Sequence, residues 1–324
     1  MSEWHSSGPC DALSVTRLTA RHGSSRQVTE YPGSADAGRS GSDPWERQDV
    51  MTLRWLITGC SSGLGLALAR AAADAGHRVL ATARRPSALD PLAAAHPARV
   101  VAARLDVRDA DQCAAAVRLA VDGFGGLDVL VNNAGCGLFG TVEETSDEEL
   151  RDQLEALVVG PWRLARLVLP LMRAQGSGHI LNVSSIAGRT GFPGLAGYIT
   201  AKHALEGLTQ ALATEAAPFG IRVTALEPGP FTTSFGAKAA ETRARIPAYE
   251  EITRQTREGV QGLADDPSLG RPAEFAELVL RVVAAPPADT PVRIPVGGPA
   301  HATIAAVEDA ARQELRQARA LSTT

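Results

Sequence analysis

The chain has 324 residues, of which 44% are hydrophobic and 21% are charged, and its formal net charge is −4. These values are typical of a soluble globular protein that is long enough to bury a full core, as one large domain or as two smaller ones. The small excess of acidic residues gives no support for nucleic acid or an anionic membrane as a partner, and no run of 18 or more apolar residues predicts a membrane span.

The cysteines are scattered and lack the paired spacing of a disulfide framework or a zinc site: Cys10, Cys60, Cys113 and Cys136. This pattern favours reduced thiols and a cytoplasmic protein. The seven histidines form no metal-ligand motif either, so we expect no bound metal.

Residues 1–50 differ in composition from the rest of the chain. They are rich in Ser, Gly, Asp and Arg and show no sustained hydrophobic period, so they bury too little to order themselves. They lack the apolar middle of a secretory signal, and their acidic residues argue against a transit peptide. Met51 stands directly before the first predicted strand. We therefore interpret residues 1–50 as a disordered or spurious leader.

From residue 53 onward, short apolar runs alternate with segments of helical pattern. Strands are predicted at residues 53–59, 77–83, 98–107, 127–135, 178–185, 221–229 and 292–298. Helices are predicted at residues 64–76, 109–125, 146–173, 198–217, 271–287 and 302–321. Short strands separated by helices indicate a parallel sheet with helices on both faces. We predict a single doubly wound α/β domain over residues 51–324, with ligands at the carboxyl ends of its strands.

The first predicted strand is followed by the glycine-rich stretch TGCSSGLG, residues 58–65. Gly59 permits a tight turn, while Gly63 and Gly65 let the backbone approach a pyrophosphate. The helix that follows would direct the free N–H groups of its first turn at that anion. Loops also use glycine simply to turn the chain, but this position between a buried strand and an amphipathic helix favours a dinucleotide site.

The second predicted strand ends at Ala83, where an acidic residue would bind the ribose hydroxyls of NAD. Arg84 and Arg85 follow instead, and a guanidinium suits the 2′-phosphate of NADP. The pattern favours NADP as the cofactor and leaves NAD open. Two solvated arginines at a strand end are the alternative interpretation.

Tyr198 and Lys202 lie four residues apart in the stretch GYITAKHALEG, so both side chains can point the same way from one helix. Hydride transfer between a nicotinamide and a carbonyl or alcohol needs a proton donor or acceptor at the substrate oxygen. A free phenol, with a pKa of about 10, is a poor base at neutral pH. A neighbouring ammonium, together with the positive nicotinamide, would stabilise the phenolate and lower that pKa. An ordinary pair on a helix surface is the alternative.

Five motifs in order resemble the short-chain dehydrogenase/reductase family over roughly residues 53–300. They are the glycine spacing of residues 58–65, NNAG at 132–135, NVSS ending at Ser185, the Tyr198/Lys202 pair and PG at 228–229. The resemblance implies a Rossmann-type fold and an NAD(P)-dependent enzyme. Ser185 would bind the substrate oxygen, Tyr198 would be the acid/base, and Lys202 would activate it. The implied cofactor-binding residues are Gly59, Ser61, Ser62, Gly63, Leu64, Gly65, Arg84, Asp106, Val107, Asn133, Ala134, Gly135, Tyr198, Lys202, Pro228, Gly229 and Thr233.

One residue departs from the family pattern. Active members usually carry an asparagine three positions before a glycine in the long helix, where it holds a water that relays protons to the lysine. Gly160 sets the register here, and Leu157 occupies that position. A rewired relay, a slower turnover and a loss of catalysis all remain open, and the intact catalytic set favours the first two. We expect Leu157→Asn to preserve folding and raise activity. Pro161 predicts a break or kink in the same helix.

Residues 230–270 are expected to form a helical flap over the nicotinamide, which is the usual specificity element of this family. Apolar walls of the substrate site would come from Phe231, Phe235 and Tyr249, with Leu138, Phe139 and Phe192 from other loops. Each aromatic side chain could equally pack beneath a loop. The pattern suits a small, mostly apolar ketone or secondary alcohol.

The leading hypothesis is an NADP-dependent oxidoreductase that interconverts a carbonyl and a secondary alcohol. The alternative is a dinucleotide-binding regulatory protein of the same fold with weak or no turnover, which Leu157 favours and the catalytic set opposes. By analogy with the family, we expect a homodimer or homotetramer that pairs through the two long helices.

Overall fold

The computed structural model describes residues 52–264, 266 and 268–322. The chain divides into two units, Met1–Gln48 and Asp49–Thr324, and all described residues belong to the second unit. The predicted leader, residues 1–50, lies outside the described residues.

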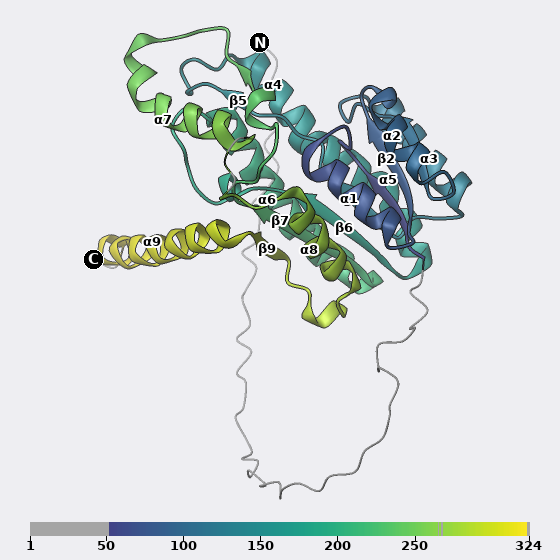
Figure 1. Cartoon of the computed structure of the whole chain (residues 1–324). Helices are drawn as coiled ribbons and strands as arrows, with labels where there is room; N and C mark the ends of the chain where they lie inside the picture. Colours follow the sequence, from purple (N-terminus) through teal and green to yellow (C-terminus); the bar gives the residue numbers. More distant parts are fainter. Residues whose placement is uncertain (1–51, 265, 267, 323–324) are drawn as a thin grey trace, which may run out of the picture. The chain divides into compact units, whose positions relative to one another are not determined.

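Within the described residues, the centre of the fold is a seven-stranded sheet in which every strand pairing is parallel (Figure 1). Its order is β3-β2-β1-β4-β6-β7-β9. The strands are β1 (Arg54–Ile57), β2 (Arg78–Ala83), β3 (Val100–Arg104), β4 (Val129–Asn132), β6 (Gly178–Val183), β7 (Ile221–Pro228) and β9 (Arg293–Val296). The chain winds outward from β1 to β3 and then returns to β4 on the other side of β1. This is the predicted Rossmann-type doubly wound topology, in which ligands bind beside the point of reversal.

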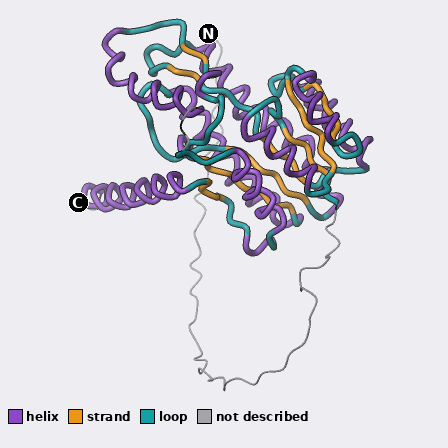
Figure 2. The backbone as a smooth tube through the Cα atoms, in the orientation of Figure 1, coloured by secondary structure: helices purple, strands orange, loops and turns teal. Residues whose placement is uncertain are grey.

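Helices cover both faces of this sheet, as Figure 2 shows. Alternate residues of β1 point to opposite faces, because successive side chains of a strand do so. Trp55 and Ile57 pack in one core with α1, α2 and α8, whereas Leu56 packs in a second core with α3, α5 and α6. The helices are α1 (Gly63–Asp74), α2 (Asp90–Ala95), α3 (Ala110–Phe124), α4 (Asp147–Leu154), α5 (Gly160–Gln175), α6 (Ala196–Ala216), α7 (Glu250–Gln261), α8 (Pro272–Ala284) and α9 (Gly298–Ser322).

The long helix predicted at residues 146–173 forms as α4, a π-helical turn at Glu155–Val159, and α5 in direct succession. Pro161 does not end the helix, so the expected break is not observed. Because proline has no backbone N–H, the carbonyl of Leu157 cannot receive the usual bond from four residues ahead. The Gly160 N–H instead donates to the Glu155 carbonyl, five residues back. The proline therefore accompanies a widened turn rather than a helix end.

The predicted flap, residues 230–270, contains α7 and a short strand, β8 (Ala240–Glu241). That strand pairs in parallel with β5 (Leu138–Phe139), and Leu138 lies opposite Ala240. Since β5 follows closely after β4, this pairing ties the flap to the carboxyl edge of the central sheet. The helical content of the flap matches the expectation, whereas the two-stranded pair has no counterpart in the sequence prediction.

Candidate active site

A cavity of about 820 Å³ lies at the carboxyl ends of the strands, between the glycine-rich loop and the flap. All the catalytic and cofactor-binding positions expected from the sequence line it. They are Gly59, Ser61, Ser62, Gly63, Leu64, Gly65, Arg84, Asp106, Val107, Asn133, Ala134, Gly135, Ser185, Tyr198, Lys202, Pro228, Gly229 and Thr233. Residues from widely separated stretches of the chain are thereby brought to one place, and their individual roles remain predictions.

The glycine-rich loop adopts backbone conformations that require glycine. Gly59 has φ +72° and Gly63 has φ +59°, both in the left-handed region that other residues rarely adopt. A Cβ on Gly59 would lie 2.7 Å from the Cα of Ala134, so the loop also packs too closely on the end of β4 for any side chain. A Cβ on Gly65 would lie 2.6 Å from the Gly59 carbonyl oxygen. The loop is thus compact and leads directly into the N-terminus of α1.

Asn133 holds this loop against the end of β4. Its Nδ2 donates to the carbonyl oxygens of Thr58 at 2.8 Å and of Gly59 at 3.2 Å. The Thr58 hydroxyl in turn accepts hydrogen bonds from the backbone N–H groups of Asn133 and Ala134, each at 2.9 Å. The NNAG motif therefore fixes the shape of the glycine-rich loop, in addition to lining the cavity.

The end of the cavity beside β2 and β3 carries a charged group that the sequence analysis did not select. Arg108 donates to the Asp106 carboxylate through Nε at 3.0 Å and through a terminal nitrogen at 2.7 Å. These bonds hold the pKa of Asp106 below its ordinary value, and the nearby Arg84 acts in the same direction. Asp106 forms a salt bridge with Arg108, whereas the Arg84 guanidinium forms no salt bridge within the described residues. Arg84 is therefore available to an anionic ligand.

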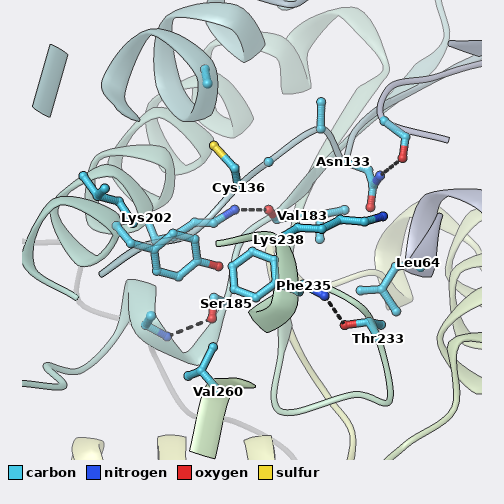
Figure 3. A pocket seen from close by; sticks show the side chains of 18 of the residues that line it. Leu64, Asn133, Cys136, Val183, Ser185, Lys202, Thr233, Phe235, Lys238 and Val260 are labelled. Atoms are coloured by element: carbon cyan, nitrogen blue, oxygen red, sulfur yellow. Dashed lines mark hydrogen bonds between the residues drawn. The ribbon is translucent and has the colours of Figure 1, made fainter. Parts of the chain in front are cut away.

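Ser185, Tyr198 and Lys202 all line the cavity, and Figure 3 labels Ser185 and Lys202. Tyr198 and Lys202 lie one turn apart on α6 and are only 8% and 5% exposed. The Lys202 ammonium donates to the Val183 carbonyl oxygen at 2.7 Å, and it lies 5.5 Å from the centre of the Tyr198 ring. Ser185 follows β6, and its hydroxyl accepts a hydrogen bond from the backbone N–H of Ala187 at 3.1 Å. The pair on α6 is thus buried at the cavity rather than placed on a helix surface.

The expected lowering of the Tyr198 pKa by Lys202 together with the positive nicotinamide stays a prediction, because it requires the bound dinucleotide. Burial raises the pKa of Tyr198 to about 12, and a hydrogen bond with Ser185 offsets only part of that rise. Burial also lowers the pKa of Lys202 to about 8, because a desolvated ammonium is unfavourable. The lysine hydrogen bonds to a backbone carbonyl, not to the phenol, so burial decides both values.

Leu157, at the position of the family asparagine, lies in the π-helical turn and is 1% exposed. It belongs to a buried cluster with Phe139, Leu195 and Tyr198. A Cβ placed on Gly135 would lie 3.1 Å from a Leu157 methyl group, so this side chain also packs against the NNAG segment. Leu157 therefore supports the floor of the site as an apolar core residue.

Residues 230–270 supply aromatic side chains to the cavity beside Tyr198. The Phe235 ring lies 5.5 Å from the Tyr198 ring, centre to centre, and Phe231 lines the cavity while packing edge-on against Phe275. Leu138 and Phe192 also line the cavity, as expected.

Two expected wall residues lie elsewhere. The Tyr249 hydroxyl donates to Glu143 at 2.7 Å outside the cavity lining, because the start of α7 turns this ring toward the segment after β5. Phe139 points into the buried cluster instead, since it alternates with Leu138 along β5.

Two more polar residues of the cavity, Lys238 and Cys136, were not selected from the sequence. Lys238 of the flap donates to the Ser62 hydroxyl at 2.7 Å. Cys136 is exposed on the cavity wall and accepts a weak hydrogen bond from Gln153 at 3.4 Å. The cysteine directly follows NNAG, so its place beside the site was readable from the motif. The lysine gave no local signal, since its partner lies 176 residues away.

Among residues 52–264, 266 and 268–322, no helix is long and apolar enough to cross a membrane. The same described residues contain no group of three or more His, Cys, Asp or Glu side chains placed to hold a metal ion.

A family model described as short chain dehydrogenase matches residues 54–244. The chain belongs to this family. It is 38% identical to the oxidoreductase BOA17 of Botryotinia fuckeliana over 248 residues, which cover 76% of this chain and 89% of that protein. It is 36% identical to the human 17-beta-hydroxysteroid dehydrogenase type 1 over 245 residues, covering 71% of this chain and 74% of that protein. The protein is thus an oxidoreductase of the kind that acts on CH–OH groups with NAD(P).

Solved structures share the fold. A short-chain dehydrogenase from Streptomyces avermitilis superposes with a TM-score of 0.78 at 43% identity, over 84% of this chain and 97% of that one. An alcohol dehydrogenase from Thermococcus sibiricus complexed with 5-hydroxy-NADP gives 0.63 at 27% identity, over 76% and 96%. A short-chain dehydrogenase/reductase from Burkholderia phymatum in complex with NAD gives 0.68 at 27% identity, over 79% and 92%. The family binds NAD(P), and these structures include both an NADP derivative and NAD.

Proposed function

We propose that this protein is an NADP-dependent oxidoreductase that interconverts a carbonyl and a secondary alcohol on a small, mostly apolar substrate. One observation carries the proposal. Ser185, Tyr198 and Lys202 share a cavity wall that is continuous with the glycine-rich loop, so a proton-transfer group and a phosphate-binding loop serve one cavity.

A bound dinucleotide would supply or accept the hydride, and the residues of this chain would handle the proton. Tyr198 is protonated at neutral pH, since its pKa is about 12, and it can therefore donate its proton to a carbonyl oxygen. Ser185 would hold the same oxygen by a second hydrogen bond. Lys202, held by the Val183 carbonyl, would keep a positive charge beside the phenolate that remains after the proton leaves.

The residues present fit a dinucleotide. Gly59 and Gly63 have left-handed backbone conformations, and Gly59 approaches Ala134 so closely that a side chain would not fit there. The glycine-rich loop therefore leaves its backbone N–H groups open to a phosphate group. NADP is favoured over NAD because Arg84 follows β2 and lines the cavity without a carboxylate partner within the described residues. Binding of NADPH and NADH to the purified chain, compared by calorimetry, tests this preference.

The shape of the reacting end supports an apolar substrate. Phe192, Phe231 and Phe235 face the cavity together with Leu138 and Val260. An apolar wall beside one buried phenol suits a neutral ketone or secondary alcohol better than a charged one, because a charged group there would lose its hydration. Two of the relatives are a hydroxysteroid dehydrogenase and a putative ketoacyl reductase, and both names agree with this chemistry.

A homodimer or homotetramer that pairs through the long helices is also proposed. On α5 the side chain of Trp162 is 57% exposed, and Val159 just before it is also exposed. Burial of such an apolar pair against a second copy would stabilise the assembly.

The free thiols of Cys60, Cys113 and Cys136 support a reducing, cytoplasmic environment.

Turnover distinguishes this function from the regulatory alternative, which the apolar Leu157 favours. The purified chain is incubated with NADPH and a panel of ketones of increasing apolar size, and NADPH consumption is followed by absorbance. We expect consumption with at least one apolar ketone. If NADPH binds but no member of the panel is reduced, the regulatory function is supported and the enzymatic one is overturned.

A further inference from the structure

Lys238 is a cation that reaches from the flap to the glycine-rich loop. It ends a short 3-10 turn (Gly236–Lys238), and its ammonium donates to the Ser62 hydroxyl at 2.7 Å. Figure 3 shows the side chain extended across the cavity toward the side where Leu64 lies. Ser62 is the N-cap of α1, so the ammonium is held at the amino end of that helix.

The other basic residues of the flap are paired with carboxylates. Arg243 contacts Glu148, Arg245 contacts Glu241, Arg254 contacts Glu251, and Arg257 contacts Glu250. Lys238 differs from all of them, because the one hydrogen bond of its side-chain ammonium within the described part of the chain goes to a neutral hydroxyl. A hydrogen bond to a neutral serine hydroxyl stabilises an exposed ammonium only weakly. The position of the Lys238 ammonium therefore favours an anionic ligand.

The surroundings of Ser62 also favour an anion. The first turn of α1 carries no acidic side chain, and Ser62 makes no side-chain capping bond within the described residues. The free N–H groups of that turn and the Lys238 ammonium therefore present positive charge to the same part of the cavity. Thr233 of the flap also lies near this loop, since a Cβ added to Gly63 would be 3.6 Å from a Thr233 methyl group. The flap is thus bonded to the glycine-rich loop through Lys238 and lies near it at Thr233.

We propose that Lys238 is a clamp for the pyrophosphate of the bound dinucleotide, and that it passes from the Ser62 hydroxyl to a phosphate oxygen when the dinucleotide binds. This inference rests on the proposed function, because it requires a dinucleotide in the cavity. The pyrophosphate is favoured over the 2′-phosphate by position: Ser62 caps α1, whereas Arg84 follows β2.

The clamp would connect the cofactor to the substrate wall. Phe235, which faces Tyr198, lies three residues before Lys238 in the same turn. Gly236 between them packs tightly on the Val260 carbonyl of α7, so the turn moves with the helix. A bond from Lys238 to the pyrophosphate would therefore hold Phe235 and α7 over the reacting end of the cavity.

The test measures dissociation constants of NADPH and NADH for the full chain by calorimetry. Lys238→Met removes the charge and keeps the aliphatic stem, and Lys238→Arg restores the charge. Arg254→Gln is the matched control, because it removes one positive charge from α7 outside the cavity lining. We expect Lys238→Met to weaken both dinucleotides by the same factor, about tenfold. Lys238→Arg should retain most of the affinity, and Arg254→Gln should bind like the wild type.

Hydrogen–deuterium exchange gives a second readout that does not depend on activity. Saturating NADPH should slow exchange across residues 230–264 in the wild type and in Arg254→Gln, but not in Lys238→Met. Equal affinity of Lys238→Met and the wild type would overturn the clamp. A loss confined to NADPH would also overturn it, since it would place the ammonium on the 2′-phosphate. If the wild type binds neither dinucleotide, the proposed function fails, and that result is distinguishable from failure of the clamp alone.

Discussion

Leu157 and Tyr198 pack in one buried cluster, so the residue at the family's asparagine position supports Tyr198 through apolar packing. The cluster also contains Ala187, Leu195 and Ala201. A polar relay at this point would have to displace well-packed apolar atoms. Leu157 therefore provides core packing where the family pattern has a polar side chain.

Leu157→Asn is expected to destabilise the protein by about 2–4 kcal/mol, because it removes a buried isobutyl group and buries an amide. This replaces the expectation of intact folding drawn from the sequence. The free energy of unfolding in urea measures it, with Leu157→Met as the control that keeps the volume and costs less than about 1.5 kcal/mol. Equal stability of Leu157→Asn and the wild type would show that the amide finds polar partners there. Turnover of the folded variant then tests whether an amide at this position speeds the reaction.

Tyr198→Phe is expected to lower turnover about 10²–10⁴-fold and to change the affinity for NADPH far less, since the hydroxyl is removed and the ring that lines the cavity is kept. Steady-state kinetics and calorimetry measure the two effects. Tyr249→Phe is a matched control, because it removes a phenol that bonds Glu143 outside the cavity lining. Comparable turnover in both variants would contradict the catalytic role of Tyr198.

Lys202 should make stability depend on alkaline pH. Its pKa is about 8 in the folded chain and 10.5 for the free side chain, so the unfolded state binds more protons between these values. The contribution of Lys202 to stability therefore rises as pH increases from about 8 to about 10.5. Urea unfolding of the wild type and Lys202→Met at pH 8 and pH 10 measures this. The wild type should gain stability relative to the variant at the higher pH, and a relative loss would disprove the burial effect.

Arg84→Ala should weaken NADPH binding about tenfold and leave NADH binding nearly unchanged, because only NADPH carries the 2′-phosphate. Calorimetric titration with both dinucleotides measures the difference. Arg85→Ala is the control, since Arg85 does not appear in the cavity lining. An equal effect on both dinucleotides would remove the basis for an NADP preference.

Trp162→Glu should shift the protein to the monomer, because it places a charge on the exposed apolar face of α5. Light scattering after size-exclusion chromatography measures the mass. Val142→Glu is a control at another exposed apolar residue, outside α5. A monomeric wild type would refute pairing through this helix.

Much of the fold was readable from the sequence because its signals are local. Buried parallel strands are short apolar runs, and the glycines of residues 58–65 stand where the backbone needs them. The cavity lining was also readable, since the motifs end or follow strands that the topology brings together. These features depend on a few neighbouring residues each.

What the sequence did not show depends on contacts between distant segments. The hydrogen bond from Lys238 to Ser62 joins residues 176 positions apart, and no local pattern marks it. The placement of Tyr249 follows from how α7 packs on the segment after β5. The π-helical turn before Pro161 and the burial of Tyr198, which raises the pKa of its phenol, are likewise properties of the assembled core.

The turn that carries Phe235 and Lys238 has a practical consequence for anyone who redesigns this enzyme. Exchanging the loop to admit another ketone would also discard the lysine, so a loss of coenzyme affinity could be mistaken for poor substrate fit. Libraries in this region should therefore keep the lysine constant while varying its aromatic neighbour.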